Sequence, residues 1–151
     1  MACFLVPLGE AVVSSVIKHT LFKENSKDTV EAAKSKSAWK ARISALEQML
    51  YAGCAVLAVE HVYHGEVIFT PPFLTAMKSP EETQVMLHEM ATVGTSMAAV
   101  VTAVWGAFCF YAWKKSKTNE IKKPGKAKLA LRFALGTALM FGVDFLFAAF
   151  A

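Results

Sequence analysis

The chain has 151 residues, a length that fits one domain, and 55% of them are apolar, with a mean hydropathy of +0.40. These values are high for a protein that folds in water, so we expect much of the chain to lie in a lipid bilayer. The net charge of +4 comes from basic residues that flank apolar runs, a pattern that argues against nucleic acid as a partner. The three cysteines are isolated in apolar segments, so no disulfide framework is expected.

The first apolar segment, residues 2–18, is interrupted by Glu10. No basic residue precedes its apolar part, so we expect it to remain as a first span and not to be a cleaved signal peptide. Residues 19–41 follow as a polar loop. In that loop, Ser26 or Asp28 as an N-cap, followed by an acidic first turn, predicts one short cytoplasmic helix.

Three further apolar segments follow in chain order. The second span is predicted at residues 42–63, the third at 86–113 and the fourth at 129–150, where Arg132 and Asp144 interrupt the apolar run. About 20 apolar residues cross the hydrocarbon core of a bilayer, and the third segment is the clearest example because most of it carries no charge. The sequence therefore predicts an all-α, integral membrane four-helix bundle formed by a single domain.

The basic residues predict how these spans are oriented. Of the 16 Lys and Arg residues, all but Lys78 and Arg132 lie in or beside the loops at residues 19–41 and 114–128. Short loops rich in Lys and Arg stay in the cytoplasm, so both loops are expected inside, and residues 64–85 form the outer loop. Both termini then lie on the outer side of a plasma membrane or bacterial inner membrane.

At helical spacing, each predicted span places small and polar residues on one side, which is where a bundle interior is expected. Close helix packing alone explains such stripes in many membrane proteins. The four predicted stripes are Cys3, Pro7, Glu10 and Ser14; Glu47, Cys54, His61 and His64; His88, Thr92, Thr95, Ala99, Thr102 and Gly106; and Arg132, Gly136, Met140 and Asp144.

Ionisable residues within these stripes need compensation, because an unpaired charge in the middle of a bilayer costs about 3 kcal/mol. With a rise of about 1.5 Å per residue from the inner boundary, Glu10, Glu47 and Arg132 lie roughly 6 to 12 Å deep and are expected to pair. This layer is interpreted equally as a salt bridge that fixes helix register or as an ion or proton relay. Asp144 is the fourth residue predicted for the ion or proton relay, and it lies nearer the outer side, where only a protonated histidine offers a positive charge.

The stretch EHVYHGE, residues 60–66, ends the second span with two histidines and two carboxylates. His64 is three residues after His61 and four after Glu60, so the three side chains can share one helix face. Gly65 can end the helix as its C-terminal cap. The pattern H-x-x-H with flanking acids is a weaker signal than a zinc-finger cysteine pair, and polar residues in the headgroup zone are an alternative explanation.

Ser79 as an N-cap, Pro80 at the first position and acids in the first turn predict the start of the helix that leads into the third span, and His88 and Glu89 follow within three turns. An antiparallel second and third span would bring these two residues to the same outer end as the end of the second span. The metal site predicted there consists of Glu60, His61, His64, His88 and Glu89. Imidazole and carboxylate ligands suit zinc, iron or manganese, and methionines beside His88 would suit copper. His61 and His88 are also candidates for the two axial ligands of haem b.

These observations predict a small polytopic membrane protein with an outer site for a transition metal or haem, used for metal-ion transport or membrane electron transfer. The alternative is a non-catalytic accessory or assembly subunit of a larger membrane complex, whose polar residues hold helices together. In either case the expected partners are the lipid bilayer and a homo-oligomer or larger complex. The sequence assigns no catalytic residue.

Overall fold

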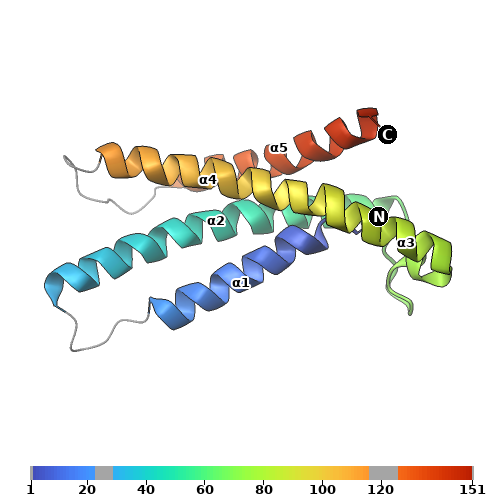
Figure 1. The fold of residues 1–151 in the computed structure, drawn as a ribbon, viewed down its shortest axis with the longest axis horizontal. Helices are drawn as coiled ribbons and strands as arrows, with labels where there is room; N and C mark the ends of the chain where they lie inside the picture. The colour runs from blue at the N-terminus through green and yellow to red at the C-terminus, as the bar shows by residue number, and fades with distance from the viewer. Residues whose placement is uncertain (1, 23–28, 116–125, 151) are drawn as a thin grey trace.

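The computed structural model describes residues 2–22, 29–115 and 126–150, and these are helical nearly throughout. Four long helices run along the molecule (Figure 1): α1 (Leu5–Leu21), α2 (Val30–Tyr63), α4 (Thr95–Lys115) and α5 (Lys126–Phe150). Between α2 and α4 lie the short 3-10 helix η1 (Thr75–Lys78), helix α3 (Pro80–Glu89) and a π-helical turn, η2 (Met90–Gly94). The predicted all-α fold with four long helices is confirmed.

Helix α2 is one continuous helix, so the prediction of a separate cytoplasmic helix before it is wrong. Its N-cap is Thr29, whose side chain accepts a hydrogen bond from the backbone N–H of Ala32. The predicted caps Ser26 and Asp28 lie outside the described residues. Residues 30–42 contain no glycine or proline, and their Ala, Lys, Glu and Arg residues favour helix. The polar turns therefore continue into the apolar part of α2 without a break.

The predicted boundaries at the other end of the molecule are confirmed. Gly65, with φ of 71°, adopts the left-handed conformation that ends a helix after His64, the C-cap residue of α2. Ser79 caps α3 by accepting a hydrogen bond from the backbone N–H of Glu82 at 3.2 Å, and Pro80 occupies the first position. These two caps bring the chain back toward the bundle through the intervening loop.

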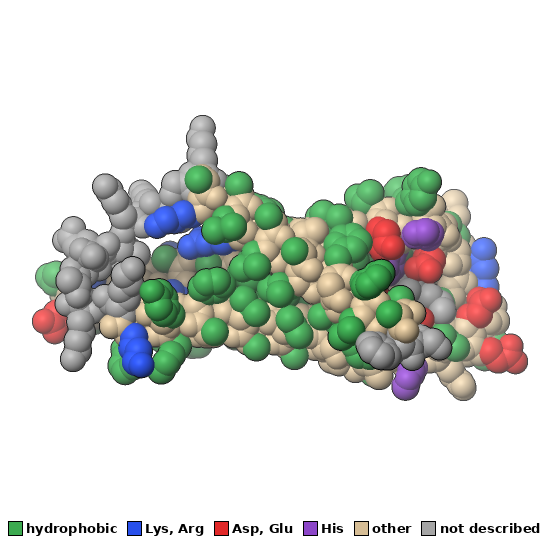
Figure 2. Space-filling model, turned by 90° about the horizontal axis from the view of Figure 1, so that it is seen from above, with side chains coloured by type: hydrophobic (Ala, Val, Ile, Leu, Met, Phe, Trp, Pro, Cys, Tyr) green, Lys and Arg blue, Asp and Glu red, His purple; other side chains and the backbone are tan. Residues whose placement is uncertain are grey.

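Among the residues that the structure describes, three helical stretches are long and apolar enough to cross a membrane: Val30–Tyr63, Pro80–Lys114 and Ala127–Ala149. Such stretches suggest an integral membrane protein. Helix α1 has 17 residues and is about 26 Å long, slightly less than the hydrocarbon core of about 30 Å, and it is not among the three. Figure 2 shows hydrophobic side chains along the middle of the molecule, with most visible Lys and Arg at one end and most visible Asp, Glu and His at the other.

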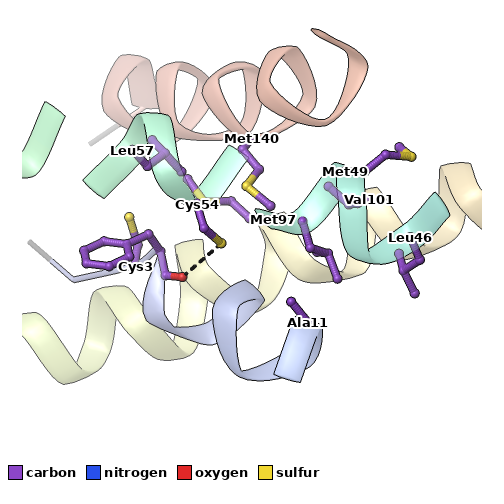
Figure 3. Close-up of a cluster of buried hydrophobic side chains, with 11 residues drawn as sticks. Cys3, Ala11, Leu46, Met49, Cys54, Leu57, Met97, Val101 and Met140 are labelled. Carbon is purple, nitrogen blue, oxygen red and sulfur yellow. Dashed lines mark hydrogen bonds between the residues drawn. The ribbon is translucent and has the colours of Figure 1, made fainter. Parts of the chain in front are cut away.

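Helix α2 is the central element of the bundle and packs against α1, α4 and α5. The main core cluster takes side chains from all four helices and from the residues before α1 (Figure 3). Leu50, Leu57 and Met97 are fully buried within it. In contrast, large apolar side chains on α4 and α5 are exposed, among them Phe108 and Phe145, as expected where helices face lipid.

Two glycines permit the closest helix approaches. A Cβ atom on Gly136 of α5 would collide with the backbone of Met49 in α2, and one on Gly53 of α2 would collide with the side chain of Met140. The collision at Gly136 involves backbone atoms, which cannot turn aside as a flexible methionine can. The backbones of α2 and α5 therefore come into direct contact at Gly136. Gly136 belongs to the small-residue stripe that was predicted to face the bundle interior in the fourth span.

We expect Gly136→Ala to destabilise the protein by about 1 to 3 kcal/mol, because α2 and α5 must separate to admit the methyl group. This loss exceeds the roughly 1 kcal/mol gain in helix propensity from replacing glycine by alanine. The matched control is Gly142→Ala on the same helix, where an added Cβ meets nothing within 4 Å. Thermal unfolding in detergent followed by circular dichroism compares the two, and equal midpoints would contradict the packing argument.

Candidate functional site

The candidate site lies at the end of the bundle where histidine side chains are visible in Figure 2. It is built from the last turn of α2, the loop after it, the residues before α1 and the second half of α5. Ala2 packs with Ala76 and Met86, which places the start of the chain at this end. Sequence segments that are far apart therefore meet around the end of α2.

His61 is the central residue of the site and is only 5% exposed. Its Nδ1 lies 3.3 Å from Oε2 of Glu60, and its Nε2 lies 3.6 Å from Sγ of Cys3 and 3.9 Å from Oε2 of Glu66. A carboxylate only accepts hydrogen bonds, so Glu60 favours the tautomer with the proton on Nδ1. In that tautomer the lone pair on Nε2 faces Cys3 and Glu66. We call Glu60, His61 and Glu66 the His61 cluster.

The loop after α2 fixes the position of Glu66 through its backbone. Its N–H donates to the carbonyl of His61 at 2.9 Å, and its carbonyl accepts from the backbone N–H and the hydroxyl of Thr75, at 3.0 and 3.1 Å. The carboxylate of Glu66 is 35% exposed, and that of Glu60 is 33% exposed. The backbone of this cluster is thus held firmly, and its two carboxylates lie at the boundary between interior and surface.

The other predicted metal ligands lie around this cluster in different environments. His64 is exposed, so its predicted place on the interior face of α2 is wrong, and its Nε2 lies 3.7 Å from Oε1 of Glu60. His88 is exposed on α3, whereas Glu89 is half-buried. Asp144 is half-buried on α5, close enough to Glu60, His61 and Glu89 to interact electrostatically with each. Within the described ranges, no three His, Cys, Asp or Glu side chains are arranged to hold a metal ion as they stand.

Cys3 is the residue of this site that the sequence analysis missed. It was predicted on the interior face of the first span, and it is indeed 3% exposed, but its contact with His61 joins residues 58 positions apart. The chain is held there by the thiol of Cys54, which donates to the carbonyl of Phe4 at 3.5 Å (Figure 3). A Cβ atom on Gly94 would lie 2.7 Å from the carbonyl oxygen of Cys3, so glycine permits this close packing.

The deeper polar layer exists, but its predicted pairing is wrong. Glu47 forms its ion pair with Lys18 of α1, and Arg132 donates to Oε1 of Gln48 at 3.3 Å. Glu10 accepts a hydrogen bond from the hydroxyl of Thr102. The reason is the position of α2 between α1 and α5: successive residues turn by 100° around a helix, so Glu47 faces α1 while Gln48 faces α5.

Each carboxylate in this layer has one buried oxygen without a hydrogen-bond partner among the described residues: Oε2 of Glu10 and Oε1 of Glu47. Glu47 itself is 6% exposed. A buried carboxylate oxygen that lacks a partner is costly, and membrane proteins keep such groups mainly along paths for ions or protons. This layer therefore has a feature that simple helix packing does not require.

The interior faces predicted for the first, second and fourth spans are confirmed at their buried positions. On the third span, three of the six predicted positions are wrong. Buried as predicted are Cys3, Pro7, Ser14, Glu47, Cys54, His61, Gly136 and Met140. On the third span, His88, Thr95 and Ala99 are exposed, and Met97 and Val101 face the core instead. Large apolar side chains fill the core at this helix, so the small-residue rule selected the wrong side.

No protein-family model matches this chain, and neither curated proteins nor solved structures give a match. The chemistry of the site therefore has to be inferred from its own side chains. Imidazole nitrogen, carboxylate oxygen and thiol sulfur are the donor atoms that proteins use for divalent transition metals. These donor atoms lie close together at one end of an apolar bundle.

Proposed function

We propose that this protein is a membrane metal-ion transporter that takes up a divalent transition metal through the His61 cluster. The observation that supports this function best is the environment of His61. Its Nδ1 is held by the carboxylate of Glu60, and its Nε2 faces the carboxylate of Glu66. Histidines that bind metals typically donate their second ring N–H to a carboxylate, which fixes the ring and raises its basicity.

The spacing of the donors supports a metal ion of zinc, iron or manganese type. Two nitrogen or oxygen ligands at about 2.0 to 2.2 Å from a tetrahedral metal lie roughly 3.4 Å apart. Nε2 of His61 and Oε2 of Glu66 are 3.9 Å apart, so a small rotation of the partly exposed Glu66 side chain would bring both within ligand distance of one ion. In this arrangement Glu60 orients His61 and need not bind the metal itself.

A metal ion agrees better with this geometry than haem b does. Both ring nitrogens of His61 already face polar groups. The buried ring also makes a T-shaped contact with the ring of Phe4, with 5.2 Å between the centroids. His88, the second axial ligand that haem would need, is exposed on α3. A copper site made of Met86 and His88 also disagrees with the structure, because Met86 is buried while His88 is exposed.

The deeper polar layer favours transport over electron transfer. Glu10, Glu47 and Thr102 form a second group of polar side chains deeper in the bundle, on α1, α2 and α4. Metal binding displaces protons from its ligands, and carboxylates with an unpartnered oxygen are suited to receive a proton or the ion. In this proposal, the His61 cluster captures the ion and the deeper carboxylates serve as the relay.

The proposed orientation places the His61 cluster and both termini on the outer side of the membrane. It is supported by the separation of charge in Figure 2, because the end with most visible Lys and Arg is opposite the end with the histidines. Loops rich in Lys and Arg stay cytoplasmic. The site would then face the compartment from which an imported metal ion arrives.

The test begins with elemental analysis and an absorption spectrum of the protein purified in detergent, followed by metal uptake into proteoliposomes. We expect about one divalent metal ion per chain after reconstitution, no Soret band, and uptake that is faster than in empty vesicles. Protein that binds no metal at any tested concentration would contradict the proposal. Binding without uptake would indicate a metal-binding membrane protein that is not a transporter.

A second candidate is an accessory subunit of a larger membrane complex or a homo-oligomer. It is favoured by the wide apolar faces of α4 and α5, where exposed aromatic side chains are concentrated; these include Phe108, Phe110, Tyr111, Trp113, Phe133, Phe145 and Phe147. Lipid or another protein can cover such a face. Under this alternative, Arg132→Leu would impair assembly, and His61→Ala would have no effect on it.

A further inference from the structure

We propose that Cys3 is a ligand of the metal bound at the His61 cluster, and that the site therefore prefers a borderline-soft divalent ion such as zinc. This inference rests on the metal-binding function proposed above. It adds a thiolate from the start of the chain to the imidazole and carboxylate donors at the end of α2. Zinc accepts sulfur, nitrogen and oxygen donors together, whereas manganese favours carboxylate and carbonyl oxygen.

The distance between the sulfur and the imidazole is the first argument. Zinc lies about 2.3 Å from thiolate sulfur and about 2.0 to 2.1 Å from imidazole nitrogen, so in a tetrahedral site the two donors are roughly 3.5 Å apart. Sγ of Cys3 and Nε2 of His61 are 3.6 Å apart. Oε2 of Glu66 approaches the same nitrogen at 3.9 Å, so thiol and carboxylate both border the one lone pair that is directed away from Glu60.

The position of Cys3 is fixed by its neighbours, which is the second argument. The carbonyl of Cys3 packs closely against Gly94 and accepts a hydrogen bond from the backbone N–H of Val6 at 3.4 Å, and the thiol of Cys54 donates to the carbonyl of the next residue, Phe4. The thiol is therefore presented to His61 by a rigid backbone, as metal ligands require. Cys3 and His61 are 3% and 5% exposed, so the pair has little room for an organic substrate, but a metal ion can fit between donors that already meet.

Binding at Cys3 is a simple exchange. The S–H bond breaks, a sulfur–metal bond forms, and the proton is released to solvent, while the metal remains divalent. The partly exposed carboxylate of Glu66 closes on the ion from the surface side. No electron is transferred, so the step needs no oxidant or reductant.

The test uses Co²⁺ as a probe, because cobalt bound to thiolate has a charge-transfer band in the near ultraviolet that cobalt bound to nitrogen and oxygen lacks. The chain has three cysteines, so the double variant Cys54→Ser/Cys109→Ser leaves Cys3 as the only thiol. The serine hydroxyl at position 54 can still donate to the carbonyl of Phe4, as the thiol does at 3.5 Å. We expect this variant and the wild type to show the same charge-transfer band at one Co²⁺ per chain. We expect Cys3→Ser to lose the band and to bind Zn²⁺ at least tenfold more weakly.

The outcomes separate this inference from the function on which it rests. Visible Co²⁺ bands of nitrogen and oxygen coordination without the charge-transfer band would overturn the role of Cys3 and leave the metal site standing. A band that disappears in Cys109→Ser alone, a change outside the proposed site, would also overturn it. Absence of any Co²⁺ or Zn²⁺ binding in the wild type would overturn both. The double variant keeps the test valid even if Cys3→Ser does not fold.

Discussion

Replacing His61 with alanine is expected to abolish metal binding at concentrations that saturate the wild type. His61 is the one imidazole of the site that is buried, and Glu60 and Glu66 both approach its ring nitrogens. Without it, the partly exposed carboxylates of Glu60 and Glu66 and the thiol of Cys3 lose the central donor that all three approach, and a closed site cannot form. Isothermal titration with Zn²⁺ and elemental analysis after gel filtration measure the loss.

Two variants serve as controls for this result. His64→Ala removes an exposed imidazole from the same helix end and is expected to retain binding, because His64 approaches the His61 cluster only through Oε1 of Glu60, 3.7 Å from its Nε2. Glu60→Gln keeps His61 as the metal ligand but replaces the carboxylate that accepts from its Nδ1 by a weaker, uncharged acceptor. We expect the metal affinity to fall by about 10- to 100-fold. Equal binding by His61→Ala and the wild type would refute the site. Circular dichroism of each variant checks that the helices remain.

Local signals in the sequence were sufficient for the helices and several of their ends. Ser79 with Pro80 marked the start of α3, and Gly65 marked the end of α2, because each supplies a specific backbone requirement. Long apolar runs indicated the helices that can cross a membrane. The extension of α2 back to Val30 was missed because a change from polar to apolar residues was interpreted as a helix boundary, although helix propensity continues through it.

Contacts between distant segments were harder to predict. The partner of Glu47 depends on which helix lies on each side of α2, and periodicity gives the face of a helix without naming its neighbour. Arg132 seemed the natural partner by depth, but α5 packs beside Gln48. Likewise, Cys3 reaches His61 only because the chain before α1 packs closely against Gly94, a tertiary contact with no local sequence signal.

The ion pair between Lys18 and Glu47 leads to a second large expected effect, on the stability of the protein. We expect Lys18→Met to destabilise the protein by about 3 to 5 kcal/mol, because it leaves the carboxylate of Glu47 buried without its ion-pair partner. The side chains of Lys18 and Glu47 are 15% and 8% exposed, so water cannot replace the lost ammonium group easily. Oε1 of Glu47 already lacks a hydrogen-bond partner within the described part of the chain, which adds to the cost. Thermal unfolding in detergent measures the change.

The double variant Lys18→Met/Glu47→Leu distinguishes a structural pair from a working relay. Replacing both members of a buried ion pair by apolar residues is often neutral or stabilising, so we expect the double variant to recover the stability lost in Lys18→Met. If Glu47 belongs to the relay, this stable double variant still binds metal at the His61 cluster but no longer supports uptake into proteoliposomes. Uptake at the wild-type rate would assign the pair to packing alone. Stability that stays low in the double variant would contradict the argument that an unpaired carboxylate is the cause.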